Sequence, residues 1–482
     1  MKGNNSLLKK SGAGPIFGEA WSPLRKSVGR KLGPDPFLAV KSLKAKGGSA
    51  MTLVRNLMWK TALTFGVVLI ASPSGVAAWQ PHEVRQLNGK DPQIRLPARF
   101  QIVTESWNRV VAVPSILYMP EKDRLLMLVG CDYPHRAYIL TSDDRGANWT
   151  NPRPAIVNKD GKPSASLGTG LAYLGNGNAL FYTDKILGKG LRWFSRDFGK
   201  TWGDAVPIAP TSDGKPWSIW DPPLVDRDKK TGEITRLVET GYARLQPPEV
   251  ERACQQGYLR FSTDEGKTWS KSIRVPQWEG VSEVALFRAG NGDLLGACRT
   301  DIPQRMKDEE LDHYEGLGIS VSKDDGRTWS TAKKLYDYGR HHPSLVLMPN
   351  EDIVMTYVVR KGYVDSKDGF PQFGIEAVVS HDHGRTWDLD HKYILHAWVG
   401  NHKGPNAWWS SSQATSSKLL PDGSIITVFG TGYRIQAGQT PRDVGLVRWR
   451  LNTEPVNADR TIRDAAIDSD LRNIFDPSRK RG

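Results

Sequence analysis

The chain has 482 residues, only three cysteines and a formal net charge of +14. Three cysteines permit at most one disulfide, which excludes a small fold stabilised by disulfides, and no Cys/His spacing fits a zinc site. We therefore expect no metal and no cofactor. The first 78 residues carry a net +10, which leaves roughly +4 for the rest. A nucleic-acid partner is not expected, because the rest of the chain lacks a clustered basic stripe.

The N-terminal part has the pattern of an export signal. Residues 1–50 form a basic leader that we expect to lie outside the mature protein, with Met51 as the true start. Residues 51–78 are predicted to be a signal peptide, with a basic beginning, an apolar stretch at 61–70 and small residues at 76–78. The alternative is a membrane anchor, although about ten apolar residues are too few to span a bilayer. We expect a periplasmic or extracellular protein without stable membrane association.

One pattern, Ser-x-Asp-x-Gly-x-x-Trp, occurs five times after residue 140. The copies are 142–149, 195–202, 262–269, 322–329 and 380–387. The Ser and Asp side chains are suited to accept bonds from nearby backbone N–H groups, and glycine supplies a positive φ. The tryptophan can bury its ring against the flanking strands. Each copy is predicted to be a structural turn of a β-hairpin.

Repeats at this spacing are typical of propeller blades. We predict an all-β fold, a six-bladed β-propeller of four-stranded blades, over residues 79–451. The units begin near Val113, Gly168, Asp221, Ser282, Pro343 and Ser416. The segments 97–105 and 444–451 are expected to close the propeller in one blade. Residues 452–482 are charged, lack an apolar rhythm and are predicted to be a C-terminal extension.

The innermost strands of a propeller begin around its axis, so the residues at those starts converge on one face. This face collects charged and aromatic residues, which is the composition that a carbohydrate site requires. The predicted substrate-binding residues are Arg136, Asp221, Arg299, Arg360, Trp408 and Trp409, and the predicted catalytic residues are Asp132, Glu283 and His342.

The repeats resemble the Asp-boxes, or BNR repeats, of the sialidase superfamily. The segment Ser282-Glu283-Val284-Ala285-Leu286, followed by Cys298-Arg299, is similar to the family segment that carries a glutamate and an arginine. The resemblance implies that Glu283 is the general base and Arg299 a ligand of an anionic substrate. A rim salt bridge between the two is the structural alternative.

Two family features are missing. Where the family has Arg-Ile-Pro in the first blade, this chain has Ala112-Val113-Pro114, and the family's nucleophilic tyrosine would fall near Ala414. The loop after the first-blade strand makes Asp132 the candidate acid, and a turn residue is the alternative. His342 is a candidate base or a hydrogen-bonded residue at a strand start.

These residues predict an exported, sialidase-like glycoside hydrolase that acts on an acidic or complex glycan. A polysaccharide lyase acting on a uronic acid would use a histidine base beside arginines. The third alternative is a carbohydrate-binding propeller without catalysis, which the missing tyrosine and arginine favour. A glycan is the expected partner in all three cases, and the oligomeric state is left open.

Overall fold

The computed structural model describes 79–107, 109–132, 134–183, 190–306, 314–361, 368–400, 403, 411–431 and 443–454. The chain divides into two compact units, Met1–Gly75 and Val76–Gly482, and every described residue lies in the second. The predicted leader and signal peptide lie outside the described residues, as do residues 455–482 of the predicted extension. No helix in the described part is long and apolar enough to cross a membrane.

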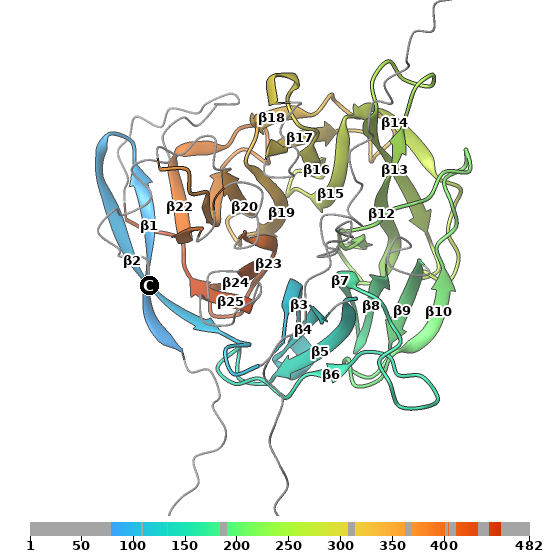
Figure 1. Ribbon diagram of the computed structural model, residues 1–482, viewed down its shortest axis with the longest axis horizontal. Coiled ribbons are helices and arrows are strands. Elements are labelled where there is room, and N and C mark those ends of the chain that lie inside the picture. Colours follow the sequence, from blue (N-terminus) through green and yellow to red (C-terminus); the bar gives the residue numbers. More distant parts are fainter. Residues whose placement is uncertain are drawn as a thin grey trace, which may run out of the picture. The chain divides into compact units, whose positions relative to one another are not determined.

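Four separate sheets of four antiparallel strands follow one another along the chain (Figure 1). The first has β3 (Val111–Met119), β4 (Arg124–Cys131), β5 (Arg136–Ser142) and β6 (Arg153–Pro154). The second has β7 (Gly168–Gly175), β8 (Asn178–Thr183), β9 (Leu191–Ser195) and β10 (Gly203–Pro207). The third has β11 (Leu224–Arg227), β12 (Ile234–Leu245), β13 (Cys254–Ser262) and β14 (Ile273–Glu279). The fourth has β15 (Val281–Arg288), β16 (Leu294–Thr300), β17 (Gly316–Ser322) and β18 (Lys333–Tyr336).

The remaining strands form one nine-stranded sheet in the order β19-β20-β21-β22-β1-β2-β25-β24-β23. They are β19 (Arg340–Leu347), β20 (Ile353–Lys361), β21 (Gln372–Ser380), β22 (Asp388–Val399), β1 (Gln80–Asn88), β2 (Asp91–Ile102), β23 (Gln413–Leu419), β24 (Ile425–Thr431) and β25 (Asp443–Trp449). Two short 3-10 turns, η1 (Pro120–Lys122) and η2 (Gln304–Met306), complete the described elements.

The fold is all-β and a propeller, but the prediction of six four-stranded blades is wrong. The described strands make four four-stranded blades and the nine-stranded sheet. The reason is the hairpin of β1 and β2, which pairs with β22 on one side and with β25 on the other. The hairpin thereby joins β22 and β25 in one sheet, although the sequence predicts that they belong to separate blades. The predicted pairing of the N-terminal segment with the last strand is present, with Phe100 opposite Val447.

Neighbouring sheets pack through apolar side chains on their facing surfaces. Leu126 and Ile139 of the first sheet share a buried cluster with Phe181 of the second. Met127 of the first sheet lies in another buried cluster with Val428 of the nine-stranded sheet. Since both faces of the first sheet are covered, its β4 is buried from Leu125 to Cys131. This packing fixes where the strand starts lie around the axis.

The five Ser-x-Asp-x-Gly-x-x-Trp segments are hairpin turns, as predicted. In the last one, Asp382 accepts bonds from the backbone N and the Oγ1 of Thr386 at 2.9 and 2.6 Å, and from Ser380 Oγ at 2.9 Å. Ser380 Oγ in turn accepts from the backbone N of Gly384 at 2.8 Å. The same bonds recur in the other four turns. None of the five aspartates lines the axial cavity described below.

Replacing Asp382 with alanine removes these three bonds and leaves Thr386 N and Ser380 Oγ without their acceptor. We expect the free energy of unfolding to fall by about 1–3 kcal/mol, measured by urea unfolding. The control is Asp160→Ala, which changes an exposed aspartate outside the five repeat turns. Its free energy of unfolding is expected to stay within about 0.5 kcal/mol of the wild type. Equal stability of the two variants would contradict a structural role for the repeat.

Candidate functional site

Five of the strands nearest the axis have a β-bulge close to their start. The pairing register shifts there in β3, β7, β15, β19 and β23. A residue with positive φ lies in each bulge: Val113, Gly170, Glu283, His342 and Ala414. Asp221, just before β11, takes the equivalent place, because it is followed by a proline as Val113 and His342 are. We call these six residues the ring positions.

The ring positions divide into an arc of small or apolar residues and an arc of ionisable residues, which we call the functional arc. Val113 and Ala414 belong to one buried cluster, against which the indole of Trp220 packs. Gly170 has φ +60°, and a Cβ there would lie 2.3 Å from the Tyr182 ring, so only glycine fits. The functional arc consists of Asp221, Glu283 and His342. Positive φ at residues other than glycine is uncommon and clusters at functional sites.

Glu283 is the centre of the functional arc. Its side chain is almost completely buried, with 2% exposure, and His342 is 4% exposed. Glu283 Oε1 accepts a hydrogen bond from Nη1 of Arg299 at 2.9 Å, and its Oε2 lies 2.8 Å from Nδ1 of His342. The predicted group of Glu283, Arg299 and His342 is therefore brought together by β15, β16 and β19.

The charges around Glu283 set its protonation state. Burial by itself would raise the pKa of Glu283, but the charge of Arg299, and at low pH that of protonated His342, outweigh it and hold that pKa at about 2. Burial lowers the pKa of His342 below its ordinary 6.5, although Glu283 opposes this shift. At neutral pH the pair is thus a carboxylate beside a neutral imidazole. Such an imidazole can accept a proton on its other ring nitrogen.

Arg299 lies between two carboxylates. It is 1% exposed, and it forms ion pairs with Glu283 on one side and with Glu315 on the other. Arg360 is also buried, donates from Nε to the carbonyl oxygen of Ser412 at 2.6 Å, and lies close enough to His342 to lower the pKa of that histidine. The predicted arginines therefore reach the functional arc, where protein groups already engage them.

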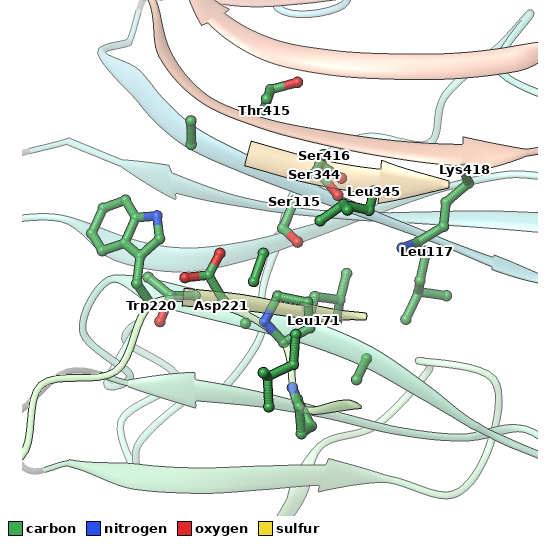
Figure 2. Close-up of a pocket in the computed structure, with 18 of the residues that line it drawn as sticks. Ser115, Leu117, Leu171, Trp220, Asp221, Ser344, Leu345, Thr415, Ser416 and Lys418 are labelled. Carbon is green, nitrogen blue, oxygen red and sulfur yellow. The ribbon is translucent and has the colours of Figure 1, made fainter. Parts of the chain in front are cut away.

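Asp221 and Trp220 lie at one end of an axial cavity of about 310 Å³, and Lys418 lies at the other end (Figure 2). Asp221 is 7% exposed. Burial, and then the negative charge of Glu283, raise its pKa well above the ordinary value for aspartate. The ring of Trp220 lies 5.4 Å from the ring of His342. Burial lowers the pKa of Lys418 to about 8.

Two other predicted residues lie at the end of the first sheet, Asp132 directly after β4 and Arg136 at the start of β5, and the described interactions do not link them to Glu283. Both oxygens of Asp132 accept from Arg109, at 3.0 and 2.6 Å, and its side chain is 49% exposed. Arg136 is the first residue of β5 and is half-buried. Trp408 and Trp409 lie outside the described residues.

Sequence reasoning missed Glu315 and Lys418. Glu315 precedes β17, away from the strand starts that the repeats define, and only its ion pair with Arg299 connects it with the site. Lys418 lies within β23. Because side chains alternate along a strand, its position between Ser417 and Leu419 indicates that it faces the opposite side of the sheet from both of them.

Replacing Arg299 with methionine would leave the buried Glu283 and the half-buried Glu315 without their shared cation. We expect the free energy of unfolding to fall by about 3–5 kcal/mol, measured by urea unfolding. Adding Glu283→Gln to Arg299→Met should recover part of this loss, because one of the two charges is then removed. The control is Arg95→Met, which breaks an exposed pair with Glu83 and should cost less than about 1 kcal/mol. Equal effects of Arg299→Met and Arg95→Met would refute the buried network.

The family model of the BNR/Asp-box repeat matches residues 260–271. No curated protein matches the chain. Among solved structures, a protein of unknown function from Dyadobacter fermentans aligns with TM-score 0.53 and 16% identity, over 78% of this chain and 100% of that chain. A Hadza microbial sialidase aligns with TM-score 0.46 and 14% identity, over 71% of this chain and 66% of that chain.

An alpha-L-arabinofuranosidase from Fusarium graminearum aligns with TM-score 0.46 and 15% identity, over 78% of this chain and 99% of that chain. Of these three, the Dyadobacter fermentans structure, at TM-score 0.53 and 16% identity, bears on the fold, and on the fold alone. The matched repeat lies in the third of the five turns, and the other four share its Ser, Asp, Gly and Trp residues and its Ser–Asp and Gly–Ser hydrogen bonds. The chain therefore carries the BNR/Asp-box repeat on a propeller fold that is similar to that of the Dyadobacter fermentans protein.

Proposed function

We propose that the protein is a glycoside hydrolase that acts on an acidic or complex glycan, with His342 as the base that activates water. The observation that carries the proposal is the contact between Nδ1 of His342 and Oε2 of Glu283 at 2.8 Å, at neighbouring ring positions. A buried carboxylate that binds one ring nitrogen orients the imidazole and leaves the other nitrogen to accept a proton.

This proposal changes the role of Glu283. A carboxylate that is engaged by Arg299 and His342, and whose pKa is held at about 2, is a weak base. A neutral imidazole whose pKa lies below 6.5 is in the right form to take a proton from water at neutral pH. Glu283 is therefore a positioning residue in this mechanism, and His342 is the catalytic base.

The placement of the arginines favours hydrolysis over a lyase reaction. A uronate lyase needs cations at the substrate carboxylate, so that the neighbouring C–H becomes acidic. Arg299 lies between Glu283 and Glu315, and Arg360 donates to the carbonyl oxygen of Ser412. These cations already serve protein groups. The buried acid–base cluster also supports catalysis over binding alone, because perturbed pKa values gather at sites that do chemistry.

The export of the protein remains part of the proposal. The basic, apolar and small-residue pattern of residues 51–78 supports it, and a glycan outside the cell would be the natural substrate of an exported hydrolase.

The test begins with a panel of sialylated, uronate-containing, sulfated and neutral oligosaccharides. We expect new reducing ends from at least one of them, without a product that absorbs in the ultraviolet. An absorbing, unsaturated product would support the lyase instead. Binding without any product would support the carbohydrate-binding alternative.

On the glycan that is cleaved, Glu283→Gln should lower kcat by about 10²–10⁴-fold, with the fold retained by circular dichroism. Because Glu283 raises the pKa of His342, removing its charge should move the acidic limb of the kcat/KM profile to lower pH. The control is Glu279→Gln, an exposed carboxylate at the end of β14, which should leave both readouts unchanged. Wild-type turnover and an unmoved acidic limb in Glu283→Gln would contradict the role of the pair.

A further inference from the structure

The carboxyl group of Asp221 is buried, and none of the described residues forms an ion pair with it. Its side chain is 7% exposed and lies on the wall of the axial cavity beside Trp220 (Figure 2). Its Oδ2 has no hydrogen-bond partner in the part of the chain that the structure describes. In such a place a carboxylate costs far more free energy than a neutral carboxylic acid does.

Asp226, only five residues further on, shows the contrast. It is as buried as Asp221, at 7% exposure, but its Oδ2 accepts from Arg236 at 2.8 Å and from Arg288 at 2.6 Å. Burial opposes ionisation of Asp226, yet the hydrogen bonds from these two arginines lower its pKa. Asp226 is thus kept ionised by arginines, and Asp221 has no such partner among the described residues.

The next ring position after Asp221 carries a negative charge at neutral pH. Glu283 is held ionised by Arg299 and His342, and its charge adds to burial in raising the pKa of Asp221. Two carboxyl groups at adjacent ring positions are therefore in opposite protonation states at neutral pH. Pairs of titratable groups whose environments separate their pKa values are typical acid and base partners.

We propose that Asp221 is the proton donor of this site, an inference that rests on the proposed hydrolysis. In a single displacement, a water molecule forms a bond to the anomeric carbon and gives a proton to His342, while the bond from that carbon to the glycosidic oxygen breaks. Asp221 gives its proton to the departing oxygen, which leaves as an alcohol. Transfer of a proton from the imidazolium to the Asp221 carboxylate, through solvent, restores the starting state.

Asp132 is the rival for this role. Both of its oxygens are engaged by Arg109, and its side chain is 49% exposed. Asp221 instead shares the functional arc with Glu283 and His342. The sequence predicted a substrate-binding role for Asp221, and its ring position supports the role of proton donor.

The activity test compares leaving groups. The probes are the cleaved glycan of the panel and the 2,4-dinitrophenyl glycoside of its terminal sugar, whose leaving group needs no proton. Asp221→Asn should lower kcat/KM by about 10²–10⁴-fold on the glycan and by less than about tenfold on the dinitrophenyl glycoside. It should also remove the alkaline limb of the pH profile, because the acid acts only while protonated. Equal losses on both probes, or a selective loss in Asp132→Asn instead, would overturn the proposal.

A second readout needs no substrate. Protonated carboxyl groups give an infrared C=O stretch, and at pH 7 its intensity should fall in Asp221→Asn but not in Asp160→Asn, which changes an exposed aspartate. Asp301 is another carboxyl group whose pKa burial raises, so the readout is the change in intensity. A spectrum without this band, or an intensity that Asp221→Asn leaves unchanged, would overturn the proposal even if the enzyme hydrolyses glycans. If the band behaves as expected but no glycan is cleaved, the proposed function fails, and the role of Asp221 as donor fails with it.

Discussion

One backbone feature, the β-bulge near the start of the axial strands, determines where the side chains of the candidate site lie. It gives positive φ to Val113, Gly170, Glu283, His342 and Ala414, each near the start of its strand. Three of these residues are small or apolar, and the other two, Glu283 and His342, have ionisable side chains. Because the bulge is built into the pairing of each strand with its neighbour, the sheet itself supports the unusual conformation.

Burial then decides what the functional arc can do. Glu283 and Asp221 are both carboxyl groups with almost no exposure, but only Glu283 has cationic or hydrogen-bonding neighbours that hold it ionised. His342 is neutral because burial outweighs the attraction of Glu283. A base and an acid thus arise from ordinary residue types, through the placement of Arg299 and the absence of a cation beside Asp221 among the described residues.

The repeated turns could be predicted from the sequence because their bonds are local, as those of Asp382 with Thr386 and Ser380 are. The number of separate sheets could not. It depends on the pairing of β1 with β22 and of β2 with β25, partners that lie more than 300 residues apart in the chain. Local alternation predicts a strand, but it does not say which edge the strand will join.

The site was predictable to the same extent. Glu283, Arg299 and His342 lie at strand starts or ends that the repeats align, so their convergence followed from the unit spacing. The role of Glu315 and the protonation state of Asp221 could not be predicted from the sequence. They depend on which charged groups lie close together in the folded chain and on how deeply each group is buried. No pattern along one strand carries that information.

The central claim is that a carboxylate at Glu283 holds a neutral His342 with its proton on Nδ1. The most direct measurement is the ¹⁵N NMR spectrum of the histidine side chains through a pH titration, with the His342 signals assigned by their loss in His342→Gln. We predict a neutral ring protonated on Nδ1 at pH 7, which takes up its second proton only below pH 6.5. A ring protonated on Nε2 at pH 7, or one that is already an imidazolium there, would contradict the claim.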